Sequence, residues 1–151
     1  MFNWFSNKYA GIFFDNNPRV SIRYILPSDS DEIKKSKKRY PFINKKTLKV
    51  ELIDYRKNKV YKFEIPKGYC FDGATVPRFF WRIIGSNTDN KFLIAALVHD
   101  VLCENHHYVD SDRKFSTQVF NALLEASEVS PIKRFLMKNS VDFYQRFCHW
   151  R

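Results

Sequence analysis

Alternating apolar and polar residues predict strands in the first half of the chain. Residues 48–55 and 60–65 both alternate, and the segment Arg56–Lys59 between them has the composition of a tight turn. We therefore expect an antiparallel hairpin here. Two earlier runs, Ile12–Phe14 and Val20–Leu26, are rich in β-branched and aromatic residues, which favour strands.

Helical spacing dominates the second half. Residues 90–103 are apolar on nearly every side, which predicts a central buried helix, and residues 77–84 can form a short one. Ser111 is expected to cap the next helix, and Pro131 to open the last, because proline suits a first helical turn. The residues that this last helix is expected to bury are Ile132, Phe135, Leu136, Phe143 and Phe147.

This order of elements predicts an α+β fold. A small antiparallel sheet from the N-terminal half would pack against a cluster of three to four helices from the C-terminal half. The 151 residues fit a single domain, 1–151. No apolar run approaches the ~18 residues that cross a bilayer, and residues 1–8 show no secretion signal. The 3 cysteines are widely spaced, which disfavours a disulfide framework and indicates a reducing compartment.

Positive charge is concentrated near the N-terminus. The chain has 26 basic and 16 acidic residues, a net charge of +10, and residues 1–60 alone carry 14 and 6, which is +8. Residues 28–47 are expected to form a charged loop or arm between strands, either merely solvated or in contact with nucleic acid or an acidic partner surface. Tyr40 and Phe42 could stack on bases or anchor this arm to the core. The candidate contact residues are Lys34, Lys35, Lys37, Lys38, Arg39, Lys45 and Lys46.

Two segments carry candidate chemistry. The first, residues 66–78, joins the hairpin to the helices and is either a structural corner or a rigid turn that holds Asp72 and Arg78 toward a pocket. The second is the end of the buried helix, where helical spacing directs His99 and Asp100 into the protein. Because an unpaired buried carboxylate is costly, each side chain needs a partner. The pair is therefore either a structural polar network or part of a catalytic site.

Metal binding is not favoured by the spacing of possible ligands. His99 and Cys103 share a helical face, and His106, His107 and Asp110 follow, but no standard structural-zinc spacing occurs. We expect neither a metal nor a cofactor.

Together the two segments resemble a phage and prophage family called domain of unknown function 1353. Like members of that family, this sequence has a strand ending in Pro-x-Gly, an Asp-Gly-Ala run before Pro-Arg, an Ala-Ala-x-x-His-Asp helix and two later helices. The resemblance covers about residues 60–145. The matching residues are Pro66, Gly68, Asp72, Gly73, Ala74, Pro77, Arg78, Trp81, Ala95, Ala96, His99, Asp100, Leu102, Arg113, Phe120, Arg134 and Met137.

The resemblance implies a phage origin but no reaction. Cys103 stands where the family has an aromatic residue, and Thr117 stands where its Arg-led helix has an Asp, so a catalytic carboxylate at that position would be missing. Three hypotheses follow. The first is a non-enzymatic virion or accessory protein that docks on other phage proteins, in the particle or the host cytoplasm. The second is a small hydrolase using Asp72, His99, Asp100 and Arg78, and the third is a basic nucleic-acid-binding protein.

Overall fold

Seven strands precede three helices in the part of the chain that the structure, a computed structural model, describes: residues 2–18, 22–24, 26–32, 42–71, 90–104 and 112–144. This order confirms the predicted α+β fold. The strands are β1 (Phe2–Ser6), β2 (Ala10–Phe14), β3 (Ile22–Tyr24), β4 (Phe42–Asn44), β5 (Leu48–Asp54), β6 (Lys59–Ile65) and β7 (Cys70–Phe71), and the helices are α3 (Asn90–Glu104), α5 (Arg113–Ala126) and α6 (Pro131–Tyr144).

The larger sheet is antiparallel and has the order β1-β2-β5-β6. Its β5–β6 pair confirms the predicted hairpin, with Leu48 opposite Ile65 at one end and Asp54 opposite Lys59 at the other. The turn lies one residue earlier than predicted, at 55–58, because Asn58 takes a positive φ of 55° and lets Lys59 join the strand. Alternation along both strands separates a buried face from a solvent-facing one.

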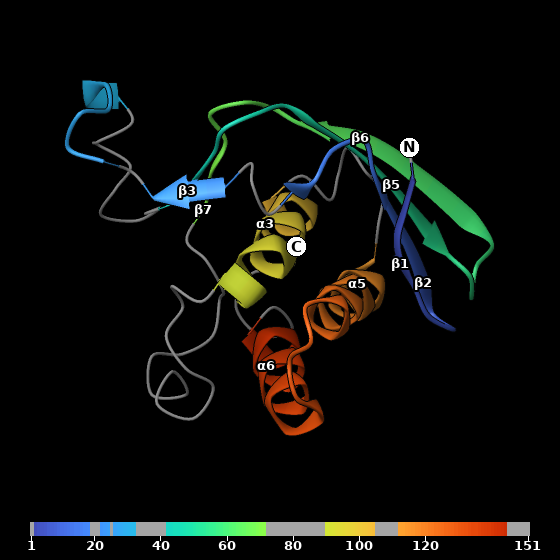
Figure 1. The fold of residues 1–151 in the computed structure, drawn as a ribbon. Coiled ribbons are helices and arrows are strands. Elements are labelled where there is room, and N and C mark those ends of the chain that lie inside the picture. Colours follow the sequence, from blue (N-terminus) through green and yellow to red (C-terminus); the bar gives the residue numbers. More distant parts are fainter. Residues whose placement is uncertain are drawn as a thin grey trace.

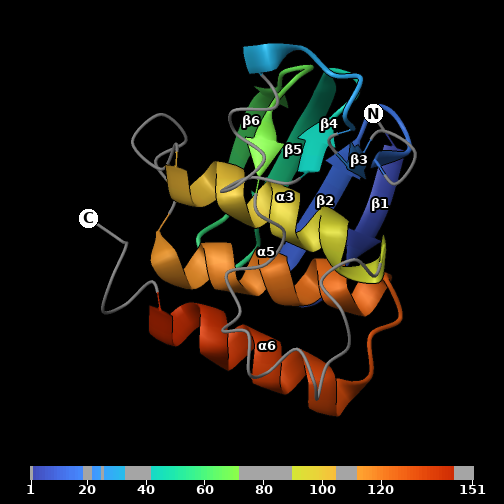
Figure 2. The same cartoon turned by 90° about the vertical axis from the view of Figure 1, so that its left-hand side faces the viewer.

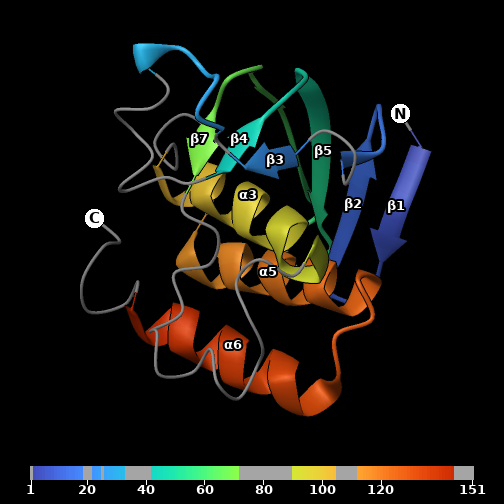
Figure 3. The same cartoon turned by 60° about the vertical axis from the view of Figure 1, so that its left-hand side comes forward.

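A smaller sheet of order β3-β4-β7 lies beside the first (Figure 3). Its central strand, β4, falls inside the segment 28–47 that the sequence suggested as an arm. Phe42 is fully buried there. The structure therefore shows Phe42 anchoring this segment to the core, which is one of the two roles predicted for it. The Asn44 side chain donates to the carbonyls of Ile65 and Pro66, at 3.3 and 3.2 Å, and so ties β4 to the end of β6.

The helices stack in layers beneath the larger sheet, with α5 in the middle (Figures 1 and 2). This helix contacts β1 and β2 on one side and both α3 and α6 on others. Phe115 of α5 stacks on Tyr61 of β6, with ring centroids 5.1 Å apart, and joins the helical layer to the sheet. Residues Leu93 to Leu102 of α3 are all buried, as its apolar circumference predicts.

Two predictions about the helices were wrong. The N-cap of α5 is Asp112 and not Ser111, because the Asp112 carboxylate accepts from the Phe115 amide at 2.6 Å. On α6, Ile132, Phe135 and Phe143 are exposed, whereas Met137 and Val141 are buried. Leu136, also predicted to be buried, is partly buried against the core. The apolar residues of α6 therefore lie on two faces, of which only one packs against the core. The predicted helix at 77–84 and the predicted burial of residue 147 lie outside the described residues.

No described helix is long and apolar enough to cross a membrane.

The packing of Phe115 predicts a large effect of its truncation. Phe115→Ala should lower the free energy of unfolding by about 3–5 kcal/mol, because a 2 % exposed ring is replaced by a cavity between α5 and the sheet. Urea unfolding followed by circular dichroism measures this. The matched control is Phe135→Ala, also on a helix but 67 % exposed, which should change stability by no more than about 0.5 kcal/mol. Equal losses in the two variants would contradict this packing.

Candidate functional site

The two candidate side chains on α3 are both inside the protein. His99 is 1 % exposed and Asp100 is 7 % exposed, although the helix around them is apolar. The sequence places His99 and Asp100 on adjacent positions, about 100° apart around the helix, so the two groups leave α3 in different directions. Neither group is isolated, since each takes part in further interactions.

The His99 ring lies between sulfur and aromatic groups. The Sγ atom of Cys103, one turn later on α3, is 3.6 Å from both Nδ1 and Nε2 of the ring. On the other helix, the Phe120 ring centroid is 5.0 Å from that of His99. The imidazole is therefore part of the packing between α3 and α5. Cys103, which replaces the expected aromatic residue, contributes a soft, weakly hydrogen-bonding partner at this place.

The strand that leads to Asp72 ends beside α3. β7 finishes at Phe71 and contacts α3, and it is held in place by pairing with β4. The structure thus brings the start of the first candidate segment to the helix that carries the second. Asp72 and Arg78 themselves lie outside the described residues, so their predicted meeting with His99 stays a prediction.

A carboxylate that sequence reasoning missed stands next to Thr117. Asp142 of α6 places Oδ1 3.1 Å from the Thr117 hydroxyl, and Arg113 forms an ion pair with the same oxygen. The sequence predicts a missing acidic group at position 117, yet one is supplied from the neighbouring helix. No local signal identifies Asp142, because it lies 25 residues from Thr117.

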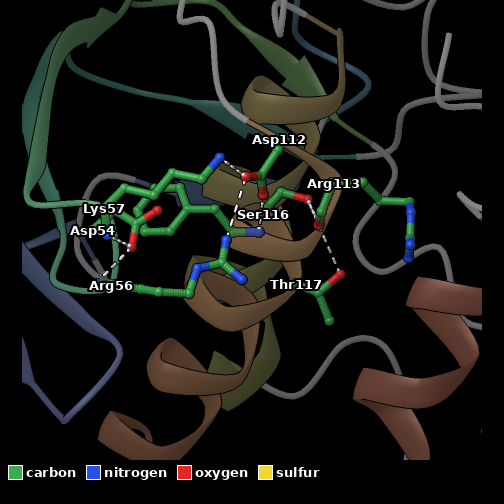
Figure 4. A network of polar contacts seen from close by, with 8 residues as sticks. Asp54, Arg56, Lys57, Asp112, Arg113, Ser116 and Thr117 are labelled. Atoms are coloured by element: carbon green, nitrogen blue, oxygen red, sulfur yellow. Dashed lines mark hydrogen bonds and ion pairs between the residues drawn. The ribbon is translucent and has the colours of Figure 1, made fainter.

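The start of α5 is also tied to the hairpin turn (Figure 4). Asp112 pairs with Lys57, and Arg56 Nη2 lies 3.4 Å from its Oδ2 atom. Asp54 Oδ1 accepts from the backbone amides of Arg56 and Lys57, at 3.0 and 3.3 Å, and fixes the turn that presents both cations.

Electrostatics at this contact favour the ionised pair. Burial alone raises the pKa of Asp112, but the hydrogen bonds from Lys57 and the Phe115 amide, with the charges of Lys57 and Arg56, bring that pKa below its usual value. The hydrogen bond to Asp112 and its negative charge raise the pKa of Lys57.

The basic candidate residues are only partly described. Lys45 and Lys46 are exposed on the β4–β5 connection. Lys67, which the sequence analysis did not select, is exposed on the neighbouring connection, where its amide donates to Thr47 Oγ1 at 3.3 Å. Two adjacent loops therefore present three lysines to solvent. Lys34, Lys35, Lys37, Lys38 and Arg39 lie outside the described residues.

A metal centre has no ready ligand set in the described part of the chain, where no three His, Cys, Asp or Glu side chains come together suitably.

Fold and site define a small α+β protein with an imidazole and a carboxylate buried on α3. The chain belongs to the family described as "Protein of unknown function (DUF1353)", which matches residues 47–141. It is also similar to "Uncharacterized protein y4jT" of Sinorhizobium fredii (strain NBRC 101917 / NGR234), with 42 % identity over 43 residues, which are 28 % of this chain and 13 % of that protein. The chain thus matches only a small part of that relative's length. No solved structure matches it significantly.

The Asp112 contact predicts a stability that depends on pH. Because folding lowers the pKa of Asp112, its stabilising effect is present above the unfolded value of about 3.8 and is lost as pH falls through the folded pKa. Asp112→Asn keeps a capping oxygen but removes the charge. It should destabilise the protein at pH 7, and the difference from wild type should shrink below pH 4 in urea titrations.

A matched variant separates the cap from the charge. Asp112→Ala should cost about 1 kcal/mol more than Asp112→Asn at every pH, because it also removes the acceptor for the Phe115 amide. A wild-type-to-Asn difference that stays constant from pH 7 to pH 3 would show that the pairing with Lys57 and Arg56 contributes nothing.

Proposed function

We propose that the protein is a non-enzymatic component encoded by a bacteriophage or prophage, which docks on a larger assembly. The burial of His99 and Asp100 carries the proposal, since a catalytic imidazole and carboxylate have to meet a substrate. In this proposal they stabilise the fold.

The contacts of His99 support a structural role. Its ring packs on Phe120 and lies against Cys103, so the imidazole surface is occupied by protein atoms. A general base must lie within hydrogen-bonding reach of the proton that it abstracts, directly or through one water molecule. With 1 % of its surface exposed, His99 has little room for either. The hydrolase hypothesis is therefore less well supported than the structural one.

Docking is supported by large apolar side chains on the surface. Val60 of β6 is 50 % exposed on the side of the sheet that faces away from α5, and Tyr9 and Tyr55, whose backbones are hydrogen-bonded to each other, are 41 and 43 % exposed. Exposed apolar patches often mark contacts with other macromolecules.

The structural role of Asp100 is tested by its removal. Asp100→Ala should lower the free energy of unfolding by about 3 kcal/mol, because the groups that interact with this buried carboxylate lose their partner. Glu64→Ala, which truncates an exposed carboxylate on β6, is the control and should stay within about 0.5 kcal/mol of wild type. Thermal and urea unfolding measure both. Wild-type stability of Asp100→Ala would remove the structural role.

Docking is tested in the infected or induced cell. Mass spectrometry should find the chain in purified particles, or a tagged copy should be recovered together with an assembly intermediate. A chain that is absent from particles and sediments only as a free monomer in the lysate would contradict the proposal. Val60→Glu should reduce this recovery, whereas Glu64→Ala, a truncation of an exposed residue on the same strand, should not.

A further inference from the structure

Helix α6 has an apolar face on each side. The inner face, with Met137 at 1 % and Val141 at 0 % exposure, packs against α5. The outer stripe of α6, defined as Ile132, Phe135 and Phe143, is 75, 67 and 64 % exposed. Ile132 and Phe143 are eleven residues apart, about three helical turns, and so lie almost in line along the outer side.

The polar residues within the outer stripe are already hydrogen-bonded to the helix. Asn139 Nδ2 donates to the Phe135 carbonyl at 2.8 Å, and Ser140 Oγ donates to the Leu136 carbonyl at 2.7 Å. One N–H of Asn139 and the Ser140 hydroxyl therefore keep their partners when this side of α6 is covered, which lowers the cost of covering it.

The charges that border the outer stripe are positive. Of the four charged residues on α6, Arg134 pairs with Glu125 and Asp142 pairs with Arg113. Lys133 and Lys138 have no ion pair among the described residues, and helical spacing places them on opposite flanks of the stripe.

We propose that the outer stripe of α6 binds the surface of an anionic lipid bilayer, with the helix lying in the interfacial plane. Insertion of large apolar side chains and attraction of lysines to anionic headgroups are the two signals that hold such helices. α6 is the outermost of the described helices (Figures 1 and 2), and its outer stripe is more than 60 % exposed. A lipid surface accepts such a stripe without a shaped groove, whereas a protein partner would need a matching groove with an acidic rim. The net charge of +10 adds long-range attraction. This inference goes beyond the proposed function and does not depend on it.

Flotation with vesicles tests the inference on the full chain. Wild type should float with vesicles of phosphatidylcholine and phosphatidylglycerol (3:1) at low salt, and binding to pure phosphatidylcholine should be at least tenfold weaker. Phe135→Glu should lower partitioning at least tenfold. The matched control is Val60→Glu, which places the same charge at an exposed apolar position on β6 and should change partitioning less than twofold.

Charge reversal separates local attraction from net charge. The double variant Lys133→Glu, Lys138→Glu should abolish flotation. The double variant Lys45→Glu, Lys46→Glu changes the net charge equally and should retain most of the flotation.

Circular dichroism checks that each variant folds, and Ile132→Glu is used in place of Phe135→Glu if that variant fails to fold. Equal flotation of wild type and Phe135→Glu would overturn the proposal. Failure of the wild-type protein to float would also overturn it. If gel filtration then showed a dimer that Phe135→Glu dissociates, the outer stripe would pair two copies of the chain and would not bind lipid. Loss of lipid binding leaves the particle experiment unaffected.

Discussion

An imidazole and a carboxylate buried in an apolar helix set the main constraint on this fold. Removing a carboxylate from water costs several kcal/mol unless other groups compensate it. His99 and Asp100 are 1 and 7 % exposed, so the groups around α3 have to supply that compensation, and both side chains take part in further interactions. α5 packs Phe120 against the His99 ring, and β7 contacts α3. The packing around α3 therefore has to accommodate two polar side chains among apolar ones.

Two consecutive residues at the start of α5 hold the layers on either side of it. Asp112 turns toward the sheet, where it meets Lys57 of the hairpin turn, while Arg113 turns toward α6 and meets Asp142. Adjacent positions on a helix point about 100° apart, which allows one helical turn to serve both directions. The helix that carries Phe115 and Phe120 is therefore fixed at its start by polar contacts and along its length by aromatic ones.

The local pattern of apolar and polar residues was sufficient to predict some elements and the faces that they bury, but not others. The β5–β6 hairpin and α3 could be predicted because alternation and an apolar circumference each allow one arrangement. α6 could not, since it has an apolar set at 132, 135 and 143 and another at 137 and 141, and hydrophobicity alone does not say which faces inward. The Asp142–Arg113 pair, formed across 29 residues, helps to fix that orientation. The carboxylate beside Thr117 could not be predicted either, because Asp142 lies 25 residues away in the sequence and only the fold brings it there.

The distribution of polar and apolar groups in this protein is partly inverted, and the inversion bears on function. Within the described residues, His99 and Asp100 lie inside, in contact with protein, while three of the largest apolar side chains of α6 lie outside. Burying Phe135 or Ile132 in a partner phase gains free energy that the isolated chain does not use. The His99 ring, by contrast, is already packed within the protein. The proposed docking and the proposed lipid binding both use exposed apolar side chains and leave the buried imidazole and carboxylate to stabilise the fold.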